Sequence, residues 1–153
     1  NDEMDDFSVK PGVPNLFGLI GAEANAIAPG KRMLSSMTPT IIEKDGKLWM
    51  VLGTPGGSTI ITSVLQVFLN VASFGMNIDD AVQALRYHHQ WLPDEIKYEN
   101  GAFSSELGIT LTSMGYKLKP IEGIGLIEAI MVDEQGLIHG AADDRGDDHA
   151  SGW

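Results

Sequence analysis

The feature that most constrains the fold is a strand-like run followed by a glycine turn and a long apolar segment. Residues 48–52 (Leu-Trp-Met-Val-Leu) are short and continuously apolar, which is typical of a strand covered on both faces. Pro55 ends this strand because proline cannot donate to a β-ladder. Residues 60–74 are apolar on nearly every side and predict a largely buried helix, which Gly75 ends. We therefore expect a core built around this strand and this helix.

The turn between strand and helix is suited to binding an anion. Gly56 and Gly57 allow backbone angles closed to other residues, and no side chain covers their N–H groups. Ser58 or Thr59 can cap the helix that follows. Exposed N–H groups at a helix N-terminus attract a phosphate, a carboxylate or the oxyanion of an acyl-transfer intermediate. The alternative is a tight turn without a ligand, since a Gly-Gly pair often occurs by chance.

Length and composition exclude several classes of protein and of binding partner. The 153 residues suit a single domain, which we predict to span residues 1–153. A net charge of −11 argues against binding to nucleic acid or to an anionic membrane surface. The absence of cysteine excludes disulfides and a cysteine nucleophile. No apolar segment is long enough to span a bilayer, and the abrupt start at Asn1 suggests a fragment or a processed product.

Two polar clusters near the N-terminus are candidate binding groups. Residues 1–6 are acidic, and Met4 and Phe7 favour burial, so the carboxylates could be held in place to bind a cation such as an ammonium group. A solvated acidic tail is the alternative. The hydroxyls of Ser35 and Ser36 can donate to a carboxylate or satisfy the local backbone. Between the clusters, residues 8–32 predict a long ordered loop.

The remaining elements follow from turn and capping residues. The Asp45-Gly46 pair predicts a hairpin of residues 40–43 and 48–52. Further on we expect a helix from Asn77 or Asp79 to 85, strands at 95–99 and 116–121, a helix at 104–114, and a hairpin of 128–132 and 137–140.

Two further motifs have simple structural interpretations. The adjacent residues His88 and His89 diverge on either a strand or a helix, and we expect packing rather than a metal site. Residues 143–149 predict a charged loop, whose Arg-Gly-Asp tripeptide we attribute to chance and which lacks the ligand spacing of a calcium loop.

Four stretches in series resemble the small subunit of a γ-glutamyltranspeptidase, and the resemblance runs over the whole chain. It implies an α+β fold that is part of the four-layer αββα sandwich of N-terminal-nucleophile hydrolases, without the opening strands. The stretches are residues 3–7 with 10–12, residues 29–32 running into 34–37, residues 55–58 and residues 86–90.

The resemblance also implies an activity. The precursor cleaves itself before a threonine, which accepts the γ-glutamyl group of glutathione or another γ-glutamyl amide and passes it to water or to an amino acid. No metal or organic cofactor takes part. That threonine is expected upstream of this chain, so the chain alone is expected to be inactive. Its expected partners are a large subunit and the upstream part of the small subunit, in a periplasmic or secreted protein.

Residue by residue, the resemblance assigns a glutamyl site. Asp6, assisted by Glu3, corresponds to the group that holds the substrate's α-ammonium. Ser35 and Ser36 correspond to the hydroxyls that receive its α-carboxylate. Gly56 and Gly57 correspond to the oxyanion hole. These assignments coincide with the three binding groups inferred above from chemistry.

Departures from the family pattern keep two other functions open. Asp144 and Trp153 replace residues usual in the family, as does the stretch at 127–129. One alternative is an acylase of the cephalosporin or glutaryl type with the same fold. The other is a non-catalytic paralogue that binds amino acids. In either case, sheet edges left open by missing strands predict self-association or pairing with another chain.

Overall fold

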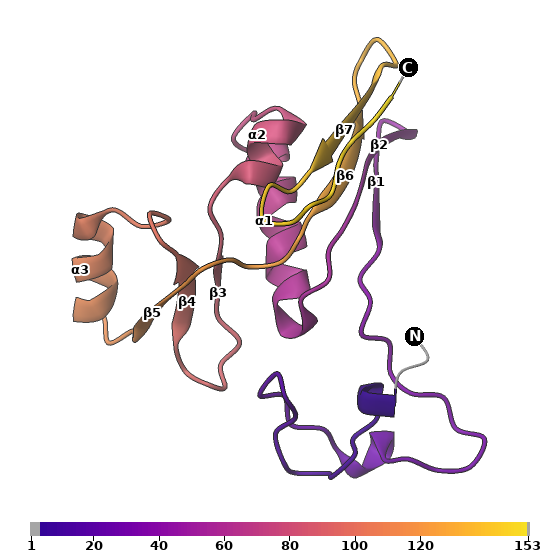
Figure 1. The fold of residues 1–153 in the computed structure, drawn as a ribbon, viewed down its shortest axis with the longest axis vertical. Coiled ribbons are helices and arrows are strands. Elements are labelled where there is room, and N and C mark those ends of the chain that lie inside the picture. The colour runs from indigo at the N-terminus through magenta and orange to yellow at the C-terminus, as the bar shows by residue number, and fades with distance from the viewer. Residues whose placement is uncertain (1–3, 153) are drawn as a thin grey trace.

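The computed structural model describes residues 4–152 and contains two β-sheets joined by helices and loops (Figure 1). No helix within residues 4–152 has the length and apolar character that crossing a membrane requires. The elements in chain order are η1 Met4–Asp6, η2 Glu23–Asn25, β1 Thr40–Lys44, β2 Lys47–Gly53, η3 Gly57–Thr59, α1 Ile60–Ala72, α2 Ile78–Gln83, β3 Tyr87–His88, β4 Ile96–Glu99, α3 Ser105–Ser113, β5 Leu118–Ile121, β6 Glu128–Val132 and β7 Ile138–Ala142.

The larger sheet is antiparallel throughout, in the order β1-β2-β6-β7. Asp45 and Gly46 connect β1 to β2 with φ angles of 54° and 74°. Two successive left-handed residues are what a two-residue hairpin turn requires. Both predicted hairpins, β1–β2 and β6–β7, are confirmed.

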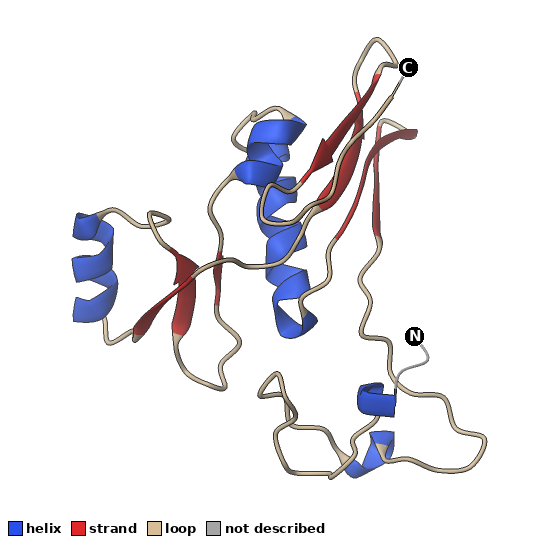
Figure 2. Cartoon of the chain, viewed as in Figure 1, coloured by secondary structure: helices blue, strands red, loops and turns tan. Residues whose placement is uncertain are grey.

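The smaller sheet has the order β3-β4-β5, and α3 lies beside it (Figure 2). The strands β3 and β4 are antiparallel, whereas β4 and β5 are parallel. Parallel neighbours need a crossover connection, which the chain makes through α3. The strands and the helix predicted from the sequence here are present, with ends that differ by up to two residues.

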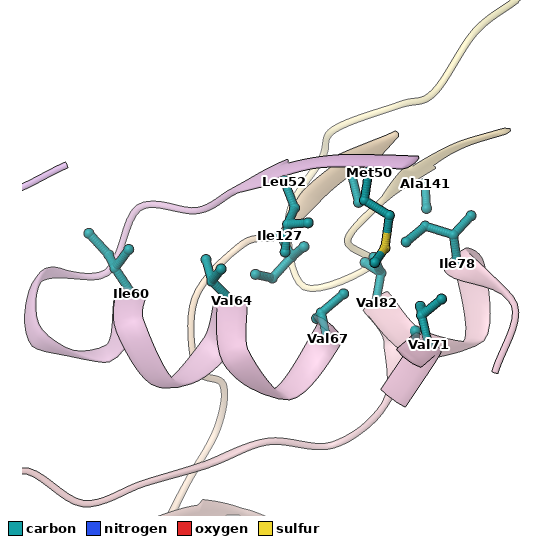
Figure 3. Close-up of a cluster of buried hydrophobic side chains, with 12 residues drawn as sticks. Met50, Leu52, Ile60, Val64, Val67, Val71, Ile78, Val82, Ile127 and Ala141 are labelled. Atoms are coloured by element: carbon teal, nitrogen blue, oxygen red, sulfur yellow. The ribbon is translucent and has the colours of Figure 1, made fainter. Parts of the chain in front are cut away.

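The hydrophobic core lies between the larger sheet and the helices α1 and α2 (Figure 3). Side chains from one face of the sheet meet one side of each helix, and Met50 and Val67 are completely buried. The buried apolar residues of this core are Met50, Leu52, Ile60, Val64, Val67, Val71, Ile78, Ala81, Val82, Ile127, Ala129 and Ala141.

Two burial expectations were wrong. Helix α1 ends at Ala72 and buries one side only, since Ile61 is 66% exposed and Leu65 is 50% exposed. Strand β2 buries Met50 and Leu52 but leaves Leu48 exposed, so it is not covered on both faces. The physical reason is that, within the described residues, helices pack on one face of the larger sheet, and apolar composition alone does not reveal how many layers cover it.

The helix caps agree with the sequence at two helices and differ at the third. Asn77 accepts a hydrogen bond from the Asp80 N–H (2.8 Å), and Ser104 accepts one from the Leu107 N–H (3.1 Å). The expected Ser58 or Thr59 cap on α1 was wrong. Residues 57–59 already form a 3₁₀ turn that runs into α1, and the Thr59 hydroxyl donates to the Gly56 carbonyl instead (2.9 Å).

Replacing Met50 by alanine tests the core. Removing a fully buried side chain leaves a cavity, and we expect the free energy of unfolding to fall by about 2–5 kcal/mol. Lys47→Ala, on the exposed start of the same strand, should change it by less than about 0.5 kcal/mol. Urea denaturation of the full-length protein measures both, and equal effects would contradict this core.

Candidate functional site

The turn predicted to bind an anion has a backbone conformation that only glycine adopts without strain. Gly56 has a φ of 140° and Gly57 a φ of 57°. A Cβ on Gly56 would lie 2.5 Å from the Thr59 hydroxyl, and one on Gly57 would lie 2.5 Å from the ring of Phe17. Among the hydrogen bonds of the described residues, none uses the N–H of Gly56 or Gly57. Both donors are therefore available to a ligand.

The residues on either side hold this turn in place. The Thr54 hydroxyl donates to the Pro55 carbonyl (2.7 Å) and accepts the N–H of Leu126 (2.7 Å). Gly125 packs so closely that a Cβ on it would lie 2.8 Å from the same hydroxyl. The strand end, the glycine turn and the segment before β6 therefore form one rigid unit.

A cavity of about 350 Å³ adjoins the turn. Its walls come from the turn itself, from the loop around Phe17, from two lysines of the smaller sheet and from a glutamate just before β4. The lining residues are Leu16, Phe17, Gly18, Gly56, Ser58, Thr59, Pro93, Glu95, Lys97 and Lys119.

Asp6 carries the clearest sign of an unfilled binding function. Its carboxylate atom Oδ2 is buried and, within residues 4–152, has no hydrogen-bond partner. Leaving a buried charged oxygen unsatisfied is costly, so such atoms usually mark a functional group. Phe7 is buried beside it, as expected, but Met4 is 59% exposed, so the expectation of two buried anchors was wrong. Glu3 lies outside the described residues.

Asn25 links the segment of the serine pair to Asp6. The Asn25 side chain donates to the Asp6 carbonyl (2.8 Å) and accepts the Leu34 N–H (3.3 Å), just before Ser35 and Ser36. Ser35 and Ser36 are exposed, and the Ser35 hydroxyl donates to the Met37 carbonyl (3.3 Å) and accepts the Met37 N–H (3.3 Å). The structure thus links the acidic cluster to the serine pair, a link that the sequence did not predict.

The loop around Phe17 connects this N-terminal region to the glycine turn. The Phe17 ring lies against Gly57, and the Phe17 carbonyl accepts a hydrogen bond from the Gln90 side chain (2.9 Å). The N-terminal region and the start of α1 lie at the same end of the molecule (Figure 1).

The two adjacent histidines lie in different surroundings. His88 is buried and contacts Thr62 (2.8 Å) and Gln90 (2.8 Å), whereas His89 lies near the surface, 3.0 Å from Asp94. Burial lowers the pKa of His88 below its ordinary value, so the ring is neutral at pH 7. Within residues 4–152, no group of three or more metal-ligating side chains could hold a metal ion.

The sequence missed a buried ion network. Arg86 pairs with Asp143, and Arg145 pairs with both Glu99 (2.6 Å) and Asp143 (2.8 Å). Residues 143–149 form a charged loop, as predicted, but at its start the Asp143 side chain is completely buried. The opposite charges of Asp143 and Arg145, two residues apart directly after β7, were the available signal, but nothing local indicated Glu99 or Arg86 as partners.

Hydrogen bonds keep both carboxylates of this network ionised. Burial raises the pKa of Glu99, but donation from Arg145 and from the backbone N–H groups of Arg86 and Ile124 outweighs it, and the pKa lies below its ordinary value. Burial acts in the same direction on Asp143, where donation from the Ile127 N–H, from Arg145 and from Arg86 lowers the pKa. The network is thus charged at neutral pH.

Asp143→Asn tests the network, because it removes the charge that pairs with Arg86. Breaking one partner of a buried ion pair leaves an unpaired charge, and we expect a loss of about 3–5 kcal/mol in the free energy of unfolding. Glu95→Gln, which breaks the more exposed pair with Lys119 (3.2 Å), should cost less than about 1 kcal/mol.

The wild type and Asp143→Asn should also differ in how steeply their stability depends on pH. Because both network carboxylates have lowered folded-state pKa values, their stabilisation is complete above the ordinary carboxyl pKa and is lost as the pH falls through the lower, folded-state value. Unfolding free energies measured from pH 7 down to about pH 3 should fall steeply below about pH 4 for the wild type and less steeply for Asp143→Asn. Parallel curves would contradict this assignment.

Sequence comparison places the chain among known enzymes. A model of the family "Gamma-glutamyltranspeptidase" matches residues 1–153. A glutathione hydrolase proenzyme of Escherichia coli is 51% identical over 154 residues, covering 100% of this chain and 26% of that protein. One of Pseudomonas aeruginosa is 52% identical over 150 residues, covering 95% of this chain and 27% of that protein. The chain thus spans about a quarter of the length of the curated relatives it matches.

Solved structures agree. A gamma-glutamyltranspeptidase of Pseudomonas nitroreducens complexed with L-DON aligns with a TM-score of 0.89 and 49% identity, covering 100% of this chain and 80% of that chain. A cephalosporin acylase of Bacillus halodurans aligns with a TM-score of 0.76 and 24% identity, covering 84% of this chain and 24% of that chain, and shows a likeness of fold alone. The predicted α+β fold of the N-terminal-nucleophile hydrolase type is confirmed. The chain therefore belongs to the gamma-glutamyltranspeptidase family.

Proposed function

We propose that the protein to which this chain belongs transfers or hydrolyses γ-glutamyl groups, with glutathione and other γ-glutamyl amides as donors. The observation that carries the proposal is the buried, unpartnered Oδ2 of Asp6, linked through Asn25 to the segment of Ser35 and Ser36. An unsatisfied carboxylate oxygen favours an ammonium ligand, and nearby hydroxyls favour a carboxylate. An α-amino acid carries both groups on one carbon.

The glutamyl group is bound by its amino-acid end. Asp6, assisted by Glu3, accepts charge-assisted hydrogen bonds from the α-ammonium. Ser35 and Ser36 donate to the α-carboxylate. These hydrogen bonds orient the substrate so that its γ-carbonyl extends away from the ammonium, toward the reacting groups. Fixing the substrate in this way lowers the entropy that the transition state has to lose.

The glycine turn stabilises the transition state. When a nucleophile adds to the γ-carbonyl, the oxygen becomes an oxyanion, and the N–H groups of Gly56 and Gly57 donate to it. The charge exists only during the addition, so these bonds accelerate the reaction rather than tighten substrate binding. Collapse of the intermediate breaks the amide bond and releases the amine with a proton. Water or an amino acid then adds to the acyl-enzyme, and the new oxyanion accepts from the same two N–H groups. Its collapse breaks the ester bond, releases the γ-glutamyl product and returns a proton to the oxygen of the nucleophile.

The nucleophile in this proposal is a threonine outside the chain, freed by self-cleavage, whose amine serves as the base. The curated relatives are described as proenzymes, which supports such a step. The rest of the small subunit and a large subunit complete the site, and no metal or organic cofactor takes part. In isolation, the chain is expected to self-associate through edge strands β1 and β7.

Two alternatives give different results in one experiment. The full-length protein is expressed, its intact masses and new N-terminus are read, and release of aniline from a γ-glutamyl anilide is measured. Cleavage before a threonine together with anilide turnover supports the glutamyl enzyme. Cleavage without glutamyl turnover favours the acylase, which has no need of an α-ammonium site. An uncleaved protein that binds glutamate favours a non-catalytic paralogue.

Asp6→Asn tests the ammonium site. Losing the charge should lower kcat/KM for the γ-glutamyl anilide by roughly a hundredfold, the value expected for about 3 kcal/mol of charge-assisted hydrogen bonding. Asp5→Asn is the matched control, because Asp5 is the exposed neighbour on the same turn, and it should leave kcat/KM within about twofold. Equal losses in both variants would refute the assignment.

Gly57→Ala tests the oxyanion assignment. The added methyl must displace the Phe17 ring or turn the N–H away, so kcat should fall by roughly a hundredfold or more. Gly12→Ala is the control, since Gly12 also has a positive φ (79°) but has open space around its Cβ position. A normal kcat for Gly57→Ala in correctly processed enzyme would overturn the role of this turn.

A further inference from the structure

Gln90 belongs to the stretch at 86–90, to which the proposed function gives no role. We propose that Gln90 is the positioning residue of the glycine turn, acting through Ser58 and Phe17. This inference rests on the proposed role of Gly56 and Gly57 in stabilising the oxyanion, because it concerns how their N–H groups are aimed.

The Gln90 amide makes four hydrogen bonds, two to its own segment and one each to the distant segments of Ser58 and Phe17. Its Oε1 accepts from the Ser58 hydroxyl (2.5 Å) and contacts His88 Nε2 (2.8 Å). Its Nε2 donates to the carbonyls of Phe17 (2.9 Å) and Leu92 (2.6 Å). All four hydrogen-bonding positions of the amide are thus filled, and the side chain has one orientation.

The chemistry of the partners fixes that orientation. Carbonyl oxygens only accept, so Nε2 has to face Phe17 and Leu92, and Oε1 has to face Ser58 and His88. His88 Nε2 then carries the proton that it donates to Gln90, and its Nδ1 lies 2.8 Å from the Thr62 hydroxyl, whose one proton faces both this nitrogen and the Thr59 carbonyl (3.1 Å). Because the buried His88 ring is neutral, one tautomer satisfies both contacts.

Gln90 binds the two residues that flank Gly57, one in sequence and one in space. Ser58 follows Gly57 directly in the chain, so its hydrogen bond to Gln90 fixes one side of the glycine peptide. The Phe17 ring lies against Gly57 on the other side, and Gln90 holds the carbonyl of the same residue. Gly57 is therefore held between two groups bound to one amide. Loss of that amide would let the N–H tilt away from the oxyanion.

Gln66 offers a matched control. It ties α1 to β3, donating to the Tyr87 carbonyl (2.8 Å) and accepting the Tyr87 N–H (3.1 Å). It has the same amide and a comparable number of hydrogen bonds, but none of them reaches the glycine turn. A variant of Gln66 therefore reports what loosening the packing of α1 against β3 does without touching Gly57.

The experiment compares Gln90→Met with Gln66→Met in the full-length enzyme after maturation, counting active sites by burst titration with a γ-glutamyl anilide. We expect kcat of Gln90→Met to fall by roughly tenfold to a hundredfold, with KM within about twofold, because a misaimed donor weakens only the transition state. Gln66→Met should retain the wild-type kcat even if its thermal midpoint falls equally.

A double-mutant cycle tests whether Gln90 acts through Ser58. Ser58→Ala removes the hydroxyl that donates to Gln90 and should also lower kcat without raising KM. The double variant should lose much less kcat than the product of the two single losses, since both substitutions remove the same hydrogen bond. If Gln90→Met fails to mature, Ser58→Ala still decides the matter. A wild-type kcat in matured Gln90→Met or in Ser58→Ala, or equal losses in Gln90→Met and Gln66→Met, would overturn the proposal. Wild-type enzyme that releases no aniline would instead refute the proposed function itself.

Discussion

The arrangement of the two sheets depends on a network of four charges, of which Arg86, Glu99 and Asp143 are buried and Arg145 is partly buried. Arg86 precedes β3, Glu99 ends β4, and Asp143 and Arg145 follow β7, so the network joins the smaller sheet to the larger one. Removing these groups from water costs several kcal/mol each, and only complete pairing offsets that cost. A shift of either sheet would leave a charge unpaired, and one relative position is therefore selected.

The same network reaches the glycine turn through the backbone. Glu99 accepts the N–H of Ile124 (2.7 Å), and Asp143 accepts that of Ile127 (2.9 Å). The residues between these two anchors include Leu126, whose N–H is bound by Thr54 just before the turn. The charges thus fix the segment against which the turn is built, at a distance from any reacting atom. This explains how a turn of flexible residues can be rigid.

What the sequence predicted well was local. The Asp45-Gly46 turn, the Asn77 and Ser104 caps and the two hairpins depend on residues close in the chain, whose chemistry allows few alternatives. The glycine turn was found for the same reason. The ion network, the one-sided burial of α1 and the Asn25 link depend on residues brought together from distant segments. No periodicity or spacing encodes such a meeting, and the assigned roles of Asp6 and the serines came from resemblance to a family.

The open face of the larger sheet completes the physical account. Ile41, Val51 and Ile130 are aligned across three strands on the face opposite the core, and Ile41 and Ile130 are exposed. An apolar row of this kind is stable in water only when another layer covers it, and a second sheet is what the sandwich of this fold class supplies. The same argument applies to Asp6 and to the glycine N–H groups, which are unsatisfied within the described chain. The apolar row therefore favours a covering layer of protein, and the unsatisfied polar atoms favour the ligand-binding roles proposed for them.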